Sequence, residues 1–285
     1  MNHAMRHPVH PLLILCAVIS GIGVAAASPQ NNRIDLDGTP DLVVRTEYTE
    51  HQWVVRDEKF AADLCSVVEG GIDPGTHRVV RFSVGTANIG DADLYLGNPQ
   101  DHINANDGLY EFALCHQHYH FRHYATYELV DPATGRLWRA AKRGFCMLDS
   151  RPDPAWMGEP AKDPNFEDCG TTTEPGNQGI SHGWTDVYDF KLGGQFFVLD
   201  GGDGQEIVPP GAYIIRITVN PPFVPQGNEP CRFLDTKTGL CHNLPESDYS
   251  NNIGEIPITI PTHPGRGGFG PLSGSPNEAT DIPER

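Results

Sequence analysis

Three histidines occupy alternate positions in the segment Cys115-His116-Gln117-His118-Tyr119-His120. If this segment is extended, its side chains alternate between two faces, and the three histidines share one face at spacings of about 7 Å. Strand twist or a bulge would then bring the three imidazoles onto one ion. Neutral imidazole suits copper and zinc, and three protein nitrogens leave coordination positions open for catalysis. The spacing therefore predicts a catalytic metal centre rather than a run of surface or core histidines.

A cupin would also begin its metal site with an H-x-H motif. It would carry a glutamate ligand a few residues after the second histidine, but Phe121–Tyr127 contains none. It would also place a histidine shortly after a later Pro-x-Gly turn, whereas Pro209-Pro210-Gly211 is followed by Ala212, Tyr213 and Ile214. The sequence disagrees with a cupin at both positions.

Short runs rich in β-branched and aromatic residues, bounded by turn residues, predict the strands that position these histidines. The runs are Asp41–Val44, Trp53–Arg56, Arg78–Val84, Tyr124–Val130, Phe145–Leu148, Gln195–Leu199, Ala212–Val219 and Ile256–Ile260. Asp131-Pro132-Ala133-Thr134-Gly135 separates two such runs and predicts a hairpin turn. Helical periodicity is scarce. We therefore expect an all-β fold, an antiparallel β-sandwich with long disulfide-held loops and little helix.

The ends of the chain differ from its middle. Leu12–Ala26 is an apolar run that ends in small residues, so residues 1–27 are predicted to be a secretory signal peptide. We expect a linker over residues 28–39, one domain over residues 40–262, and a flexible Gly/Pro-rich tail over residues 263–285. Ser150–Gly183 is too long for a plain connection and is predicted to be an ordered functional loop held by Cys169. No later run is long enough to span a membrane, so we expect a secreted or periplasmic protein.

The formal net charge of −17 argues against nucleic-acid binding, which needs a basic face. The charge is compatible with cationic substrates, and equally with a role in keeping an exported protein soluble. Loss of the signal peptide leaves six cysteines, which can form three disulfides in an oxidising compartment. Thiolate metal binding is the alternative, but no C-x-x-C pair is present. Cys231 and Cys241 enclose a short loop and are the clearest pair.

The histidine segment, followed by Tyr127-Glu128-Leu129-Val130-Asp131, resembles the copper-binding signature of the lysyl oxidase family. Other segments resemble the family in the same order, from about Pro40 to Pro261, with divergence after Asp149 and around Cys231–Cys241. They are Pro40-Asp41-Leu42-Val43, Lys142-Arg143-Gly144-Phe145-Cys146-Met147, Gln178-Gly179-Ile180-Ser181 through Asp186-Val187-Tyr188, Val219-Asn220-Pro221 and Glu246-Ser247-Asp248-Tyr249-Ser250-Asn251-Asn252.

The resemblance implies a copper-dependent amine oxidase with His116, His118 and His120 as copper ligands. It also implies a lysine tyrosylquinone cofactor that forms from Lys142 and Tyr188. Primary amines, either peptidyl lysine or small amines, would be converted with dioxygen into aldehydes, ammonia and hydrogen peroxide. The resemblance further implies disulfides Cys115–Cys169 and Cys65–Cys146. The chain shows no long basic or scavenger-type N-terminal extension, which points to a bacterial-type member.

The catalytic base is left open. Animal members carry a candidate histidine just before the Tyr-Asp/Glu-Leu segment, and here Thr126 stands at that position. His123, His182 and Asp149 are the candidates to replace it.

The closing segment gathers hard oxygen ligands of the kind that calcium prefers. By position, the resemblance implies a structural calcium site built from Asp41, the Leu42 carbonyl, Glu246, Asp248, Asn251 and Asn252. An Asx-rich turn without metal is the alternative.

Two other functions use the same histidines. One is a non-catalytic copper-binding sandwich that acts in adhesion or metal handling, and the other is a zinc hydrolase. The Lys142 and Tyr188 segments favour the oxidase over both.

Overall fold

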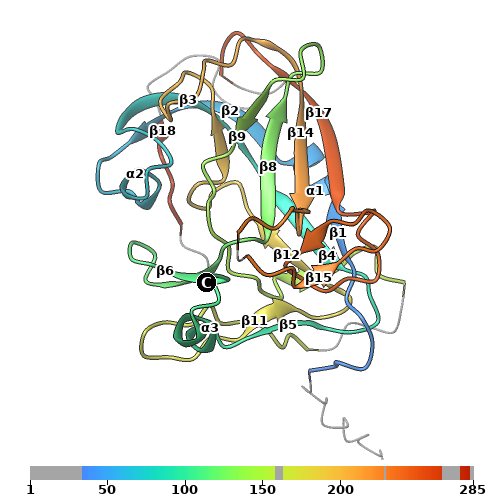
Figure 1. Cartoon of the computed structure of the whole chain (residues 1–285). Helices are drawn as coiled ribbons and strands as arrows, with labels where there is room; N and C mark the ends of the chain where they lie inside the picture. Colours follow the sequence, from blue (N-terminus) through green and yellow to red (C-terminus); the bar gives the residue numbers. More distant parts are fainter. Residues whose placement is uncertain (1–33, 158–162, 228, 265–276, 283–285) are drawn as a thin grey trace, which may run out of the picture. The chain divides into compact units, whose positions relative to one another are not determined.

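Strands form most of the regular structure in the described residues, which are 34–157, 163–227, 229–264 and 277–282 of this computed structural model (Figure 1). The predicted signal peptide lies outside these residues, as does the first part of the predicted linker. No helix among the described residues is long and apolar enough to cross a membrane.

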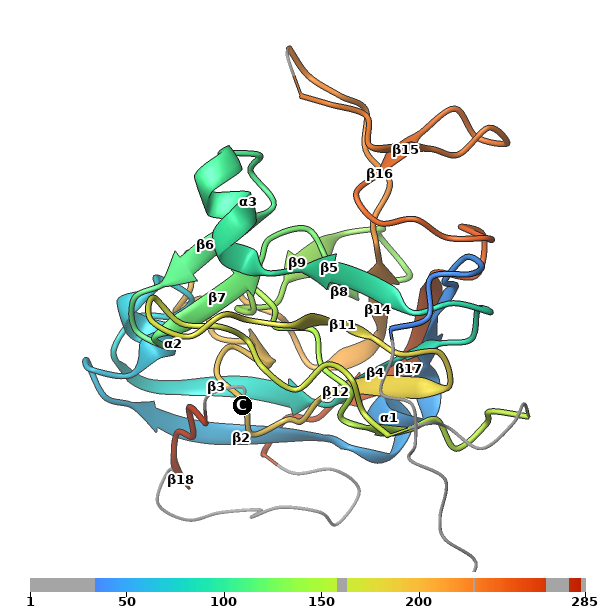
Figure 2. The ribbon, with the colours of Figure 1, turned by 90° about the horizontal axis from the view of Figure 1, so that it is seen from below.

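The strands of the described residues form three larger sheets and three short pairs (Figure 2). One sheet has the order β17 (Ile253–Ile260), β14 (Gly211–Val219), β8 (Ala125–Val130), β9 (Leu137–Arg139). The second has the order β1 (Leu42–Arg45), β4 (Val84–Asn88), β12 (Trp184–Tyr188), β10 (Arg151–Pro152). The third has the order β13 (Phe196–Val198), β3 (Gly75–Phe82), β2 (Trp53–Phe60), β18 (Asn277–Glu278). The short pairs are β11 (Gln178–Ile180) with β5 (Leu94–Gly97), β6 (Tyr110–Ala113) with β7 (His118–Phe121), and β15 (Phe233–Leu234) with β16 (Cys241–His242).

The strand pairing is antiparallel, except that β18 runs parallel to β2. Helices in the described residues are short: α1 (Thr46–His51), α2 (Cys65–Val68) and α3 (Pro99–Ala105). The helix α3 begins where the Asn98 side chain accepts a hydrogen bond from the Gln100 backbone and proline occupies the first turn, both of which favour a helix start.

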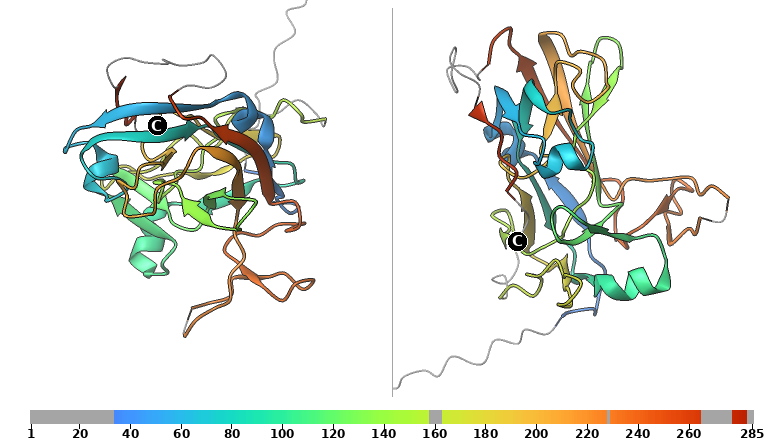
Figure 3. Two further views of the ribbon diagram at one scale, coloured as in Figure 1. Left: turned by 90° about the horizontal axis from the view of Figure 1, so that it is seen from above. Right: turned by 90° about the vertical axis from the view of Figure 1, so that its left-hand side faces the viewer.

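Sheets pack face to face through aromatic and β-branched side chains (Figure 3). Strand β17 shows why, since Ile256, Ile258 and Ile260 are buried while the residues between them are exposed. Across the core, the Phe82 ring of β3 lies 5.5 Å from the Tyr127 ring of β8, measured between centroids, and stacks on Phe197 of β13 at 4.8 Å. The prediction of an all-β fold with little helix is confirmed.

Most predicted strands coincide with observed ones, and the turn at residues 131–135 joins β8 to β9. The prediction for Phe145–Leu148 is wrong. Phe145 exchanges backbone hydrogen bonds with Phe121, whereas the Met147 backbone bonds Gly179 and the Gln178 side chain. Because successive residues bond different partners, no ladder forms.

The disulfides among the described residues are Cys65–Cys115, Cys146–Cys169 and Cys231–Cys241. The last pair confirms the prediction, but the pairings Cys115–Cys169 and Cys65–Cys146 are wrong. Cys65 opens α2 with its Cα 5.4 Å from that of Cys115, and the Cα atoms of Cys146 and Cys169 are 5.5 Å apart. Both distances suit a disulfide. The long loop is thus tied by Cys169 to Cys146, beside the Lys142 segment.

The predicted flexible tail is wrong for residues 277–282. Strand β18 pairs with β2, and the buried Arg81 guanidinium donates to the Thr280 carbonyl at 2.9 Å. The Gly193 backbone also donates to the Ile282 carbonyl. This segment is therefore part of the fold and lies beside the site described next.

Candidate metal centre

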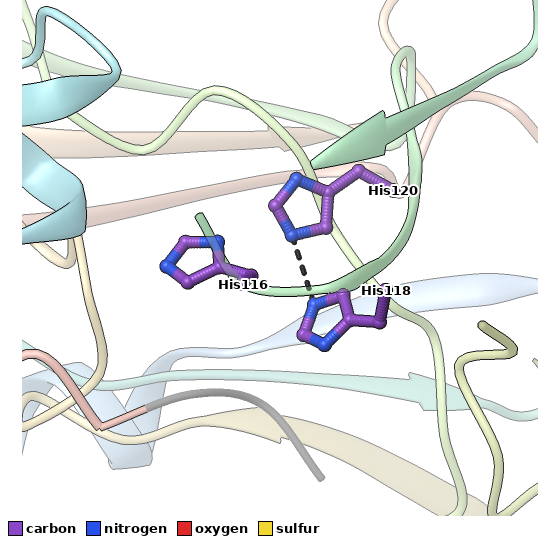
Figure 4. A group of neighbouring side chains, drawn as sticks. All are labelled: His116, His118 and His120. Atoms are coloured by element: carbon purple, nitrogen blue, oxygen red, sulfur yellow. Dashed lines mark hydrogen bonds between the residues drawn. The ribbon is translucent and has the colours of Figure 1, made fainter. Parts of the chain in front are cut away.

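The three histidines converge (Figure 4). His118 and His120 belong to β7, whereas His116 precedes it in a turn. The centroid of the His116 ring lies 5.2 Å from that of His120 and 5.6 Å from that of His118. One ring nitrogen from each histidine lies within 4.8 Å of the other two. This is the one group of three or more His, Cys, Asp or Glu side chains within the described residues that could hold a metal ion.

The path of the chain corrects the expectation of a continuous strand. In an extended segment, His116 and His120 would be about 13 Å apart. Gln117 instead adopts a left-handed conformation with φ of 62°, and its backbone donates to the Ala113 carbonyl at 2.7 Å. The chain therefore turns between His116 and His118, and this turn brings His116 over the pair on β7.

The arrangement of the ring nitrogens suits metal binding better than it suits hydrogen bonding of the nitrogens to one another. The Nε2 atoms of His118 and His120 are 3.0 Å apart. Both ring nitrogens of His116 are buried without a hydrogen-bond partner among the described residues. Burial, with the charge of Lys142 and the neighbouring rings, lowers the pKa of His118 to about 4 and that of His120 to about 2. The rings are therefore neutral at neutral pH, as a metal ligand must be.

Close packing fixes His120. An ideal Cβ on Gly144 would lie 2.4 Å from Nδ1 of His120, so only glycine allows the Lys142 segment to pass so near the ring. The Cys65–Cys115 disulfide fixes the residue directly before His116.

Lys142 and Tyr188 lie side by side. The Nζ atom of Lys142 is 5.3 Å from the centroid of the Tyr188 ring and 5.6 Å from that of Phe145. Tyr188 is buried on β12, and its hydroxyl donates to the Cys146 carbonyl at 2.9 Å. Lys142 also lines a pocket with His116 and His120. The structure thus brings together the predicted cofactor precursors and the predicted copper ligands.

Burial makes the Lys142 amine easier to deprotonate. It lowers the pKa of Lys142 to about 7, against the opposing effect of the Glu69, Asp186 and Asp281 carboxylates. A substantial fraction of the amine is therefore neutral near pH 7, the form in which nitrogen is a nucleophile.

Asp186 is a residue of this site that the sequence analysis missed. It stands two positions before Tyr188 on β12, so both side chains leave the same face of the strand. Burial raises the pKa of Asp186 to about 8, although the Tyr188 and Tyr124 hydroxyls favour its ionised form. Its Oδ2 atom is buried without a hydrogen-bond partner among the described residues. Its two-residue spacing from Tyr188 could have found it, but no strand was predicted over Trp184–Tyr188.

The predicted candidates for the base are engaged in contacts of their own. Asp149 accepts hydrogen bonds from the Ser181 backbone and hydroxyl at 2.8 and 2.7 Å, and from two further backbone groups. His182 pairs with Asp93 at 3.2 Å, and His123 lies edge-on to Phe121. Asp149 does border Tyr188 in a second pocket, but its hydrogen bonds indicate a structural role.

The predicted calcium ligands are partly assembled. The Asp41 carboxylate accepts from Asn251 at 2.9 Å and Ser247 at 3.1 Å. Glu246 accepts from the Leu42 backbone and from Asn252, both at 2.7 Å. Asp248 instead accepts from Ser250 and pairs with Lys237. The opening segment and the loop before β17 thus meet, and calcium itself stays a prediction.

The comparisons with known proteins identify a family. The lysyl oxidase family model matches residues 49–228. The chain is similar to protein-lysine 6-oxidase from Bos taurus, with 26% identity over 238 residues, 79% of this chain and 47% of that relative. It is also similar to lysyl oxidase homolog 1 from Homo sapiens, with 29% identity over 245 residues, 81% of this chain and 34% of that relative.

Lysyl oxidase homolog 2 from Rattus norvegicus is 27% identical over 263 residues, 88% of this chain and 27% of that relative. The chain therefore spans less than half the length of these three relatives. The family match covers more than half of the chain and includes the histidine turn, Lys142 and Tyr188. On this match, the chain belongs to the lysyl oxidase family.

Proposed function

We propose that the chain is a copper-dependent amine oxidase whose organic cofactor is a quinone made from Lys142 and Tyr188. The observation that carries this proposal is the position of the Lys142 side chain, whose amine lies 5.3 Å from the centre of the Tyr188 ring and which lines one pocket with His116 and His120. The net reaction is R-CH2-NH2 + O2 + H2O → R-CHO + NH3 + H2O2. The name protein-lysine 6-oxidase of a relative supports the same chemistry.

His116, His118 and His120 would hold the copper, which in this family supplies, with dioxygen, the oxidation of the tyrosine ring. The other residues supply position and protons. Contact with Phe145 and Tyr188 keeps the Lys142 nitrogen close to the ring. Its lowered pKa provides a neutral amine near pH 7.

Asp186 is the carboxyl best placed to take up or return a proton at the Tyr188 hydroxyl. It leaves the same face of β12 as Tyr188, and its pKa of about 8 lies close to neutral pH. This assignment replaces the three earlier candidates for the base.

The substrate is a primary amine, either a peptidyl lysine or a small amine. We place the protein outside the cytoplasm because its disulfides fit an oxidising compartment. Calcium bound at the predicted site would tie Asp41 to the closing segment.

The experiment is amine-dependent hydrogen peroxide production by the copper-loaded protein. We expect production with wild type and with the control Lys191→Arg, an exposed lysine in the turn after β12. Lys142→Arg and Tyr188→Phe should abolish production while leaving the bound copper unchanged. Copper binding without peroxide in wild type would favour the non-catalytic copper module, and selective zinc binding would favour the hydrolase.

A further inference from the structure

The pocket beside the metal centre is lined by one carboxylate that the sequence did not reveal, Glu69, and a second, Asp281, lies against Gly193 of its wall. Its wall includes Glu69 and Gly193 together with His116, His120 and Lys142. Glu69 directly follows α2, which the Cys65–Cys115 disulfide holds beside the histidine turn. Its Oε1 atom lies 3.5 Å from Nδ1 of His116. One carboxylate is therefore fixed at the entrance to the metal site.

The C-terminal segment brings the second carboxylate. Asp281 accepts hydrogen bonds from the Ser66 backbone at 2.8 Å and from the Ser66 hydroxyl at 2.9 Å. An ideal Cβ on Gly193 would lie 2.1 Å from Oδ1 of Asp281. The carboxylate thus occupies the space that the glycine leaves open in the pocket wall.

The pocket already contains an amine, the side chain of Lys142. Glu69 is the carboxylate that acts on it most strongly, and Asp281 adds to the effect. The neighbouring His116 side chain is only 8% exposed, and neither of its ring nitrogens has a hydrogen-bond partner among the described residues. The pocket therefore holds one alkylamine side chain, beside a carboxylate and next to the metal ligands.

Formation of the proposed cofactor would change the ionisable groups of this pocket. Once the Lys142 nitrogen is bonded to an electron-poor ring, it no longer takes up a proton. Glu69 and Asp281 then lie beside the pocket without the ionisable amine of the precursor. A primary amine substrate is an alkylammonium ion in water at neutral pH, so it can take the place of the amine that the pocket has lost.

We propose that Glu69, assisted by Asp281, binds the ammonium group of the substrate and so selects cationic alkylamines. This inference rests on the proposed oxidase function, because it assigns the step at which the substrate enters that site. Glu69 is thereby a specificity-determining residue rather than only a neighbour of His116.

The test replaces the Lys142 amine with a free amine added to the solution. Lys142→Ala removes the side-chain atoms that n-propylammonium reproduces, and this variant cannot form the cofactor. We expect the copper-loaded Lys142→Ala protein to bind n-propylammonium in a calorimetric titration at pH 7. Wild-type precursor prepared without copper should bind it with an affinity that is lower by about tenfold or more. Neutral n-propanol should not bind. Adding Glu69→Gln should weaken binding by about tenfold or more, and Asp281→Asn should weaken it less.

The matched control is Glu174→Gln in the same background, since Glu174 is exposed and outside the pocket. Unchanged affinity after Glu69→Gln, equal binding of n-propanol, or no binding by a folded Lys142→Ala protein would overturn the inference. Loss of copper in Glu69→Gln with unchanged amine affinity would assign Glu69 to positioning His116 only.

A second measurement covers the case in which Lys142→Ala does not fold. In mature protein, Glu69→Gln should raise KM for n-propylamine about tenfold. Its kcat and its quinone content should equal those of Glu174→Gln, with the quinone titrated with phenylhydrazine. An unchanged KM overturns the inference. Absence of quinone in wild type contradicts the oxidase proposal instead, and the two failures are thus told apart.

Discussion

Burial moves the pKa of one carboxyl and of one amine toward neutral pH at this site. Asp186 and Lys142 both border Tyr188, and burial is the largest cause of both shifts. A base and a nucleophile with pKa values near neutral pH can exchange protons without a strong acid or base. The same burial is costly for the fold, and this cost can be measured.

The Asp186 carboxyl should make the precursor less stable as the pH rises. Its pKa is about 8 in the folded chain and about 4 in an unfolded one. Between these values the folded chain holds a proton that the unfolded chain has lost, so the free energy of unfolding falls with pH. We expect Asp186→Asn to reduce the fall in the free energy of unfolding by up to about 1.4 kcal/mol per pH unit. Denaturant unfolding between pH 6.5 and 8 measures this slope.

This window avoids the opposite contribution of the buried histidines, whose lowered pKa values change stability below about pH 6.5. The exposed Asp73 provides the control Asp73→Asn. Equal slopes for wild type and Asp186→Asn would show that the carboxyl is already ionised at neutral pH.

The histidines and the cofactor precursors could be predicted because each lies within a short local motif. Glu69 and Asp281 could not be found in that way. Glu69 and Asp281 reach the pocket from segments far apart in the chain, and only the disulfide and the C-terminal strand bring them to it.

At the scale of elements, the centre depends on a turn and a disulfide more than on a strand. The left-handed Gln117 places His116 over β7, and Cys115 anchors the turn to α2. Alternating burial made strands such as β17 predictable. The pairing of four cysteines was not predictable, since it depends on which loops meet in space.

Removing the Cys65–Cys115 bond should loosen the metal site. In the double variant Cys65→Ser, Cys115→Ser we expect copper affinity to fall by about tenfold or more, the range seen when groups that orient metal ligands are lost. Competition with a chelator of known affinity measures this change. The double variant Cys231→Ser, Cys241→Ser is the control, because its disulfide joins the β15–β16 region. Equal losses in both double variants would contradict a specific role for the α2 tether.

At the scale of the molecule, metal binding and folding should be coupled. The three imidazoles come together only when the turn, β7 and the Lys142 segment are in place. The packed sheets supply this framework and were predictable as an all-β class. The ordered C-terminal segment was not, since its contacts arise from single residues rather than from a repeating pattern.

Copper should therefore stabilise the folded chain. At free copper about 100 times its Kd, the free energy of unfolding should rise by about 2.7 kcal/mol, with a matching rise in Tm that a chelator reverses. His118→Ala should lose this effect, whereas His51→Ala, an exposed histidine of α1, should keep it. Equal stabilisation of both variants would place the copper elsewhere.

The most direct test of the central claim is a peptide map of the copper-loaded, air-exposed protein by mass spectrometry. We predict that the peptides containing Lys142 and Tyr188 are recovered as one covalently linked species, which is missing from Lys142→Arg and Tyr188→Phe. Recovery of both peptides separate and unmodified, from protein with copper bound to the histidines, would contradict the account.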